Sequence, residues 1–151
     1  MEPLESVHSN TRILIIEDDE EMRSLLDDFC VEEGFETDSI SNGYEALGIL
    51  IRKPFDLIMT EIRMPGSTGL DILPRIRTLQ PAVPIIVMTA FGSDEVHQRA
   101  YGREATVYLE KPIHFQKLRE LIHQIILSHR APLSPTGREE GKERGRGWLE
   151  S

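Results

Sequence analysis

The sequence has one cysteine, no long apolar run and no excess of basic residues, and each shortage excludes a class of protein. With Cys30 alone, no intramolecular disulfide can form, and a cytosolic protein is the simplest interpretation. No apolar stretch approaches the length of a membrane span. The start, MEPLESVHSN, has neither the basic nor the apolar region of a secretory signal. We therefore expect a cytoplasmic protein that makes no membrane contact.

Basic residues are outnumbered, and the formal net charge of the 151 residues is −9. Residues 130–151 carry five basic and four acidic side chains, which leaves −10 for residues 1–129. An acidic body repels phosphate backbones, so the composition argues against direct binding of nucleic acid.

The length predicts one compact domain with short ends. We expect a lead over residues 1–10, a folded domain over 11–130 and a flexible tail or linker over 131–151. The tail prediction follows from APLSPTGREEGKERGRGWLES, which is rich in glycine, proline and charge.

Strand and helix patterns alternate along the domain. Short apolar or alternating runs predict strands at 12–16, 35–40, 55–60, 84–89 and 106–109. Helical spacing of apolar residues predicts helices between them, and a polar helix is expected over 93–102. The residues expected on the apolar stripes are Met22, Leu25, Leu26 and Phe29; Ala46, Leu47, Leu50 and Ile51; Leu70, Leu73, Ile76 and Leu79; and Phe115, Leu118, Ile122 and Ile125. Five strands alternating with five helices predict a doubly wound α/β fold with a parallel sheet covered on both faces.

Polar residues with related chemistry follow four of the predicted strands. Glu17, Asp18 and Asp19 follow the first, Glu61 the third, Thr89 closes the fourth, and Lys111 follows the fifth. In an open parallel sheet, functional groups collect beyond the carboxyl ends of the strands. Acids facing a hydroxyl and an ammonium could hold a hard divalent cation and a phosphoryl group.

At this point the chain resembles the receiver domains of bacterial two-component response regulators over residues 11–129. The motifs that carry the resemblance are ILIIEDDEEMR, DLIMTEIRMPGSTGL, PIIVMTAFGS and YLEKP. The resemblance implies a flavodoxin-like five-stranded sheet of order 2-1-3-4-5. It also implies a switch module in a phosphorelay, rather than an enzyme, that receives a phosphoryl group from a histidine kinase.

The resemblance also implies roles for individual residues. Glu17 and Asp18 match the acid pair that holds Mg²⁺, together with the acceptor position and the backbone carbonyl of Arg63. Thr89 matches the switch hydroxyl, Tyr108 the switch aromatic, and Lys111 the ammonium that faces the phosphoryl group.

Glu61 departs from the family pattern, because it stands where the motif has the phospho-accepting aspartate. Its extra methylene moves the carboxylate toward Thr89 and Lys111 and away from the geometry needed for attack, and phosphoryl transfer depends on such positioning. A carboxylate in that place can pair with Lys111 and accept from Thr89, as a phosphoaspartate would. We therefore expect blocked phosphorylation, partial mimicry of the active state, and Mg²⁺ affinity that is millimolar at best, on the order of simple carboxylate sites.

Other interpretations of the Glu61 position stay open. Glu61 could accept phosphate slowly, or it could be a laboratory Asp→Glu substitution in an ordinary receiver; Asp56 begins its strand too far away to replace it. A metal-dependent aspartate phosphatase also places acids on such a sheet. However, EDDEE lacks the Asp-x-Asp arrangement, and the chain is too short for a cap domain.

Partner contacts are expected on the face made by the fourth helix, the fifth strand and the fifth helix. Receivers use this face to dimerise or to bind output proteins, and it carries His97, Tyr101, Tyr108, Glu110 and Lys117 here. The helix over 93–102 has few apolar anchors, mainly Val96 and Ala100, and is expected to shift. His97, His114, His123 and His129 are interpreted as surface residues and Cys30 as a buried apolar residue.

Overall fold

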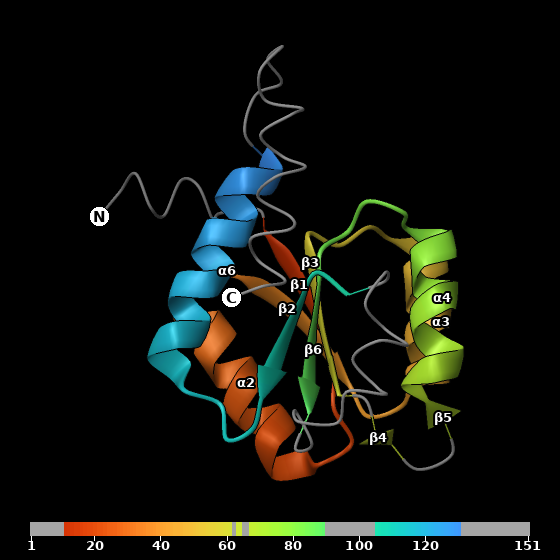
Figure 1. Cartoon of the computed structure of the whole chain (residues 1–151), viewed down its shortest axis with the longest axis horizontal. Helices are drawn as coiled ribbons and strands as arrows, with labels where there is room; N and C mark the ends of the chain where they lie inside the picture. The colour runs from red at the N-terminus through yellow and green to blue at the C-terminus, as the bar shows by residue number, and fades with distance from the viewer. Residues whose placement is uncertain (1–10, 62, 65–66, 90–104, 131–151) are drawn as a thin grey trace.

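A five-stranded parallel sheet forms the centre of the molecule (Figure 1). The computed structural model describes residues 11–61, 63–64, 67–89 and 105–130. Its strands are β1 (Arg12–Ile16), β2 (Glu36–Ile40), β3 (Leu57–Glu61), β6 (Ile85–Thr89) and β7 (Val107–Glu110). Their spatial order is β2-β1-β3-β6-β7, and every pairing is parallel. This is the predicted order 2-1-3-4-5, so the doubly wound α/β fold is confirmed.

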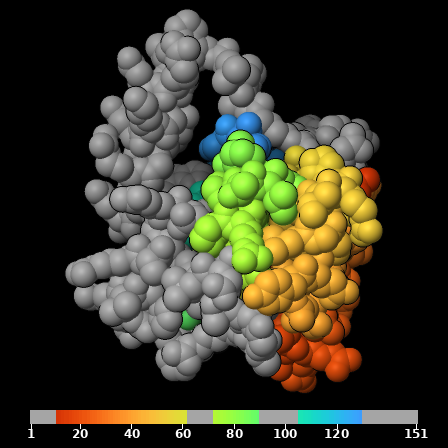
Figure 2. Space-filling model, turned by 90° about the vertical axis from the view of Figure 1, so that its right-hand side faces the viewer, coloured from red at the N-terminus to blue at the C-terminus, as the bar shows by residue number. Residues whose placement is uncertain are grey.

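Four described helices cover the two faces of the sheet. Helices α2 (Glu20–Glu32) and α6 (Phe115–Arg130) lie on one face, and α3 (Gly43–Arg52) and α4 (Gly69–Leu79) lie on the other (Figure 1). Figure 2 shows α3 and α4 side by side on their face of the molecule. The helix expected over 93–102 lies outside the described residues, as do the expected lead and the whole of the expected tail, so the three domain boundaries stay predictions.

Alternate residues of each inner strand face opposite helix layers, which explains the apolar strand sequences. Leu14 and Ile16 of β1 pack in the α3 and α4 layer, whereas Ile13 and Ile15 pack in the α2 and α6 layer. All four side chains have no exposed surface. The prediction that the run RILII is buried on both faces is confirmed.

The apolar stripes of the helices are narrower than expected. Leu25 is 50% exposed, Ile51 70% and Leu79 39%, so these three residues of the expected stripes stay largely in solvent. In α2 the fully buried side chains are Leu26 and Cys30, which lie one turn apart, and Met22 and Phe29 pack against the same layer while partly buried. A helix that packs on a flat sheet contacts it along one line, and residues at the margin of the apolar stripe stay in solvent.

Side-chain hydrogen bonds from the end of α4 hold the backbone segments that lead into β3 and β6. The Gln80 side chain accepts from the Phe55 backbone N–H at 3.2 Å and donates to the carbonyls of Leu50 at 3.1 Å and Lys53 at 3.0 Å. Arg77 donates to the carbonyls of Pro81 at 3.1 Å and Val83 at 2.5 Å. This amino-edge network, defined by Gln80 and Arg77, satisfies the backbone where α3 and α4 end.

A short antiparallel pair that the sequence did not suggest follows β3. Strands β4 (Arg63–Met64) and β5 (Ser67–Thr68) pair with each other and form a separate two-stranded sheet (Figure 1). The pair lies directly after Glu61 in the chain.

Candidate functional site at the carboxyl edge

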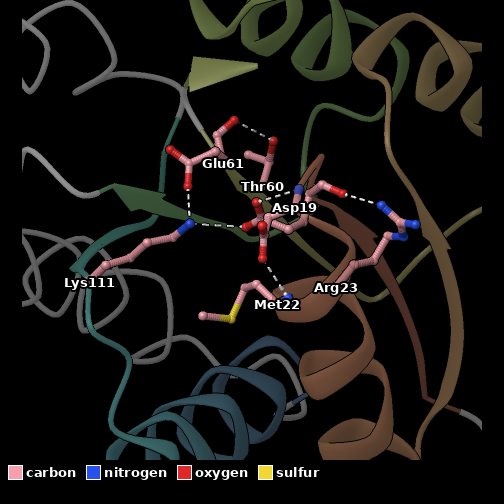
Figure 3. Close-up of polar contacts among 7 residues, drawn as sticks. Asp19, Met22, Arg23, Thr60, Glu61 and Lys111 are labelled. Atoms are coloured by element: carbon pink, nitrogen blue, oxygen red, sulfur yellow. Dashed lines mark hydrogen bonds and ion pairs between the residues drawn. The ribbon is translucent and has the colours of Figure 1, made fainter. Parts of the chain in front are cut away.

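Two acids and one lysine meet beyond the carboxyl ends of the strands. Lys111 Nζ lies 2.5 Å from Glu61 Oε1 and 3.2 Å from Glu17 Oε1 (Figure 3). The side chains of Glu17 and Glu61 are 1% and 7% exposed, and that of Lys111 is 21% exposed. We call these three residues the acid–lysine cluster.

The parallel sheet brings these residues together from distant parts of the chain. Glu17 directly follows β1, Glu61 ends β3, and Lys111 directly follows β7. The Lys111 backbone N–H donates to the Thr89 carbonyl at 2.8 Å, which fixes the start of the lysine side chain beside the end of β6. The Lys111–Pro112 peptide bond is cis.

Glu17 is held by its backbone as well as by Lys111. Its N–H donates to the Ile40 carbonyl at 2.9 Å, and its Oε2 accepts from the Asp19 backbone N–H at 3.2 Å. The Arg23 guanidinium donates to the Glu17 carbonyl at 2.9 Å. Contacts from the end of β2, from the residue before α2 and from α2 therefore fix both the backbone and the side chain of this glutamate.

Burial and charge act in opposite directions on the two groups. Loss of solvent raises the pKa of Glu17, and the positive charge of Lys111 and the Asp19 N–H only partly offset this. Burial alone would lower the pKa of Lys111, but the hydrogen bond to Glu61 and the charges of Glu17 and Glu61 outweigh it and raise that pKa. The lysine is thus a fixed cation at neutral pH.

The other predicted site residues take different positions. Thr89 is buried at the end of β6, where it pairs in register with Glu110. Tyr108 is half-buried and packs against the core layer of α3 and α4. Asp18 is exposed. Asp56 lies at the opposite edge of the sheet, where its Oδ2 accepts from the Arg12 backbone N–H at 2.8 Å, as expected.

The carboxylates are the right chemistry for Mg²⁺, but their arrangement does not fit the ion. Among the described residues, no group of three or more His, Cys, Asp or Glu side chains is placed to hold a metal ion. Glu17 and Glu61 both contact Lys111 instead of facing a shared vacant position. The metal ligands implied by the resemblance, including the Arg63 carbonyl, therefore stay a prediction.

The roles of two residues of this region were not expected from the sequence. Asp19 caps α2, because its Oδ2 accepts from the Met22 N–H at 2.8 Å (Figure 3). The backbone N–H of Asp19 also donates to the Glu17 side chain. An Asp before an acidic first turn is a recognisable capping signal. Arg23 gave no signal, since its contact with Glu17 depends on how the loop turns.

The described histidines and the cysteine differ in their exposure. His114 and His129 are exposed as expected, and His97 lies outside the described residues. His123 is not a plain surface residue, because it is half-buried and its Nε2 lies 3.2 Å from Glu33 Oε1. Cys30 is buried, and burial followed by the charges of Asp27 and Glu33 raises its pKa to about 12. An inert, apolar role for Cys30 is therefore supported.

Comparison with known proteins identifies the fold and its family. The family model described as Response regulator receiver domain matches residues 13–123. The response regulator protein PilR of Pseudomonas aeruginosa is 35% identical over 114 residues, which cover 76% of this chain and 26% of PilR. Sporulation initiation phosphotransferase F of Bacillus subtilis is 29% identical over 117 residues, which cover 78% of this chain and 94% of that protein. The chain thus spans about a quarter of one of these relatives and nearly the whole of the other.

Two solved structures are also similar. A two-component response regulator from Clostridium difficile is 29% identical with a TM-score of 0.76, and the match covers 81% of this chain and all of that one. The response regulator TrrA from Thermotoga maritima, solved in complex with Mg²⁺-BeF, is 33% identical with a TM-score of 0.68. That match covers 76% of this chain and 98% of TrrA. No described helix is both long and apolar enough to cross a membrane.

Proposed function

We propose that this chain, which belongs to the family of response regulator receiver domains, works in phosphorelay signalling without being phosphorylated. Glu61 occupies the acceptor position and holds the switch partly in its active arrangement. The single observation that carries the proposal is the 2.5 Å contact between Glu61 Oε1 and Lys111 Nζ.

The contact supports a loss of acceptor function. A phosphoryl acceptor needs a carboxylate oxygen that is free to attack in line with the leaving group, and misplacement by about 1 Å can cost 100-fold in rate. Oε1 of Glu61 is committed to the Lys111 ammonium, and the side chain is 7% exposed. A donor such as acetyl phosphate would have to break this ion pair before an acyl phosphate could form and acetate could leave.

The same contact supports partial mimicry of the active state. In the family the lysine faces the phosphoryl group, and here a carboxylate has extended to meet it. Glu61 carries one negative charge where a phosphoryl group carries about two, so the substitute is incomplete. We propose that Thr89 and Tyr108 respond to Glu61 as they would, more fully, to a phosphoaspartate.

The proposed partners are those of a cytoplasmic receiver. A histidine kinase or an output protein would contact the face of β7 and α6, and a second copy of the chain could use the same face. Glu110 and Lys117 are exposed on these two elements. Tyr108, also proposed for this face, is half-buried on β7, and the last two proposed residues, His97 and Tyr101, lie outside the described residues.

Treatment with a phosphoryl donor tests the loss of acceptor function. The full chain, incubated with acetyl phosphate and Mg²⁺, should keep its mass, whereas Glu61→Asp should gain one phosphoryl group in the mass spectrum. Glu61→Gln is the matched control and should stay unlabelled. Stoichiometric labelling of the unaltered chain at Glu61 would contradict the proposal and favour a slow acceptor. None of the three samples should hydrolyse an aryl phosphate, and turnover would favour the phosphatase alternative.

The environment of Tyr108 tests the mimicry. Glu61→Gln keeps the side-chain shape and removes the charge, so it should move the Tyr108 signals in the NMR spectrum toward the inactive arrangement. Beryllium fluoride should move the signals of Glu61→Asp in the opposite direction. Identical Tyr108 signals in the unaltered chain and in Glu61→Gln would show that the charge of Glu61 does not act on the switch.

A further inference from the structure

We infer that Lys111 is the resident cation of this site and takes the place that a divalent metal ion would otherwise fill. The buried carboxylates of Glu17 and Glu61 need a positive charge beside them, and the ammonium of Lys111 supplies it. The inference deepens the proposed function, since both take Glu61 as a partner of Lys111.

The contacts of the acid–lysine cluster engage both oxygens of Glu17 and one oxygen of Glu61. Lys111 Nζ contacts one oxygen of Glu17 and one of Glu61, at 3.2 and 2.5 Å. The second oxygen of Glu17 accepts from the Asp19 backbone N–H at 3.2 Å. Both oxygens of the most buried acid are therefore already engaged.

The resemblance implies one further carboxylate for a metal, that of Asp18, and this residue is exposed. Mg²⁺ requires six oxygens at about 2.0–2.1 Å in near-octahedral geometry. An ammonium makes no such demand, because it is a point charge with three donors that can rotate. The acid–lysine cluster provides what an ammonium needs, and it does not provide the octahedral set of oxygens that Mg²⁺ needs.

Placing Mg²⁺ beside the ammonium would also bring like charges together at a buried site. Repulsion there is screened far less than at the surface. A divalent ion could enter only if Lys111 gave up both contacts. The prediction is therefore that removing the charge of Lys111 creates a metal site, and that the unaltered chain lacks one.

A Mg²⁺ titration of the full chain, without any phosphoryl donor, tests this inference. Amide shifts and heats of binding would be measured for the unaltered chain, for Lys111→Gln and for Lys117→Gln. The last is a matched control, because Lys117 is an exposed lysine one turn into α6. Only Lys111→Gln should show saturable binding, with a Kd on the order of 1 mM. MgCl₂ should also raise the melting temperature of that variant and of no other.

Saturable Mg²⁺ binding by the unaltered chain at about the same or higher affinity would overturn the inference. So would a folded Lys111→Gln variant that binds no Mg²⁺. If the variant fails to fold, the Lys111 ammonium signal of the unaltered chain gives a second measurement. That signal should be protected from exchange with solvent. Mg²⁺ at about 10 times the expected Kd should leave the signal unchanged, and a shift would count against the inference. Because no phosphoryl donor is present, failure here is distinct from failure of the proposed function.

Discussion

The two edges of the sheet are held together by different chemistry. At the carboxyl edge, ion pairs join the largely buried charges of Glu17, Glu61 and Lys111. At the amino edge, Gln80 and Arg77 bond to backbone carbonyls and one N–H, and no buried acid takes part. Burying an ion cluster costs free energy of desolvation, and removing one of its charges is strongly destabilising. Hydrogen bonds to the backbone each contribute a smaller stabilising free energy, which does not change with pH near neutrality. The fold thus keeps its sensitive contacts at one edge.

The largest expected effect comes from removing the cation of the carboxyl edge. Lys111→Met should destabilise the protein by about 3 kcal/mol, because Glu17 and Glu61 would be left as buried charges without the cation that neutralises them. Urea denaturation at neutral pH measures it. Adding Glu17→Gln and Glu61→Gln to Lys111→Met should recover much of the loss. A triple variant as unstable as the single one would show that packing, and not charge, holds this edge.

The amino edge should respond less, although more hydrogen bonds are lost. Gln80→Ala removes three bonds to the backbone of residues 50–55 and should cost about 2 kcal/mol. The cost is smaller because water can reach part of this half-buried position. Thr78→Ala, which removes one bond to the Pro74 carbonyl on an exposed part of α4, is the matched control and should cost under about 1 kcal/mol.

These two edges were not equally open to prediction. The parallel sheet and the meeting of Glu17, Glu61 and Lys111 at its carboxyl edge followed from apolar runs and from where such a sheet places the residues after its strands, whereas the strand order was implied by the family resemblance. The network of Gln80 did not, because a glutamine in a loop gives no sign of which carbonyls it will face. The sequence did not show that Leu25 and Ile51 would stay exposed, because a pattern of apolar residues does not reveal how wide the contact between helix and sheet will be. The pair β4 and β5 was missed because two-residue strands leave no periodicity to detect.

Acidity should affect the carboxyl edge alone. The pKa of Glu17 is raised in the folded protein, so the folded state keeps this proton longer than the unfolded state. The corresponding stability is present below the ordinary glutamate pKa and is lost as pH rises through the raised one. Glu17→Gln should therefore lose less stability than the unaltered chain as pH rises from about 4.5, by up to about 1.4 kcal/mol per pH unit. Gln80→Ala should follow the unaltered chain in parallel, and a change of slope in that variant would break the comparison.

The smallest effect is expected for a lysine whose ion pair is short but exposed. Lys53 Nζ lies 2.7 Å from Asp38 Oδ2, closer than Lys111 lies to Glu17, yet the two side chains are 39% and 36% exposed. Water solvates both charges in the folded and the unfolded state, so Lys53→Ala should cost only about 0.5 kcal/mol. Moderate salt should remove most of that difference, while the loss in Lys111→Met should persist, because a buried pair is screened much less. Denaturation of both variants at low and high salt measures the contrast. If Lys53→Ala cost as much as Lys111→Met, distance rather than burial would rank the ion pairs of this protein, and the distinction drawn for the carboxyl edge would fail.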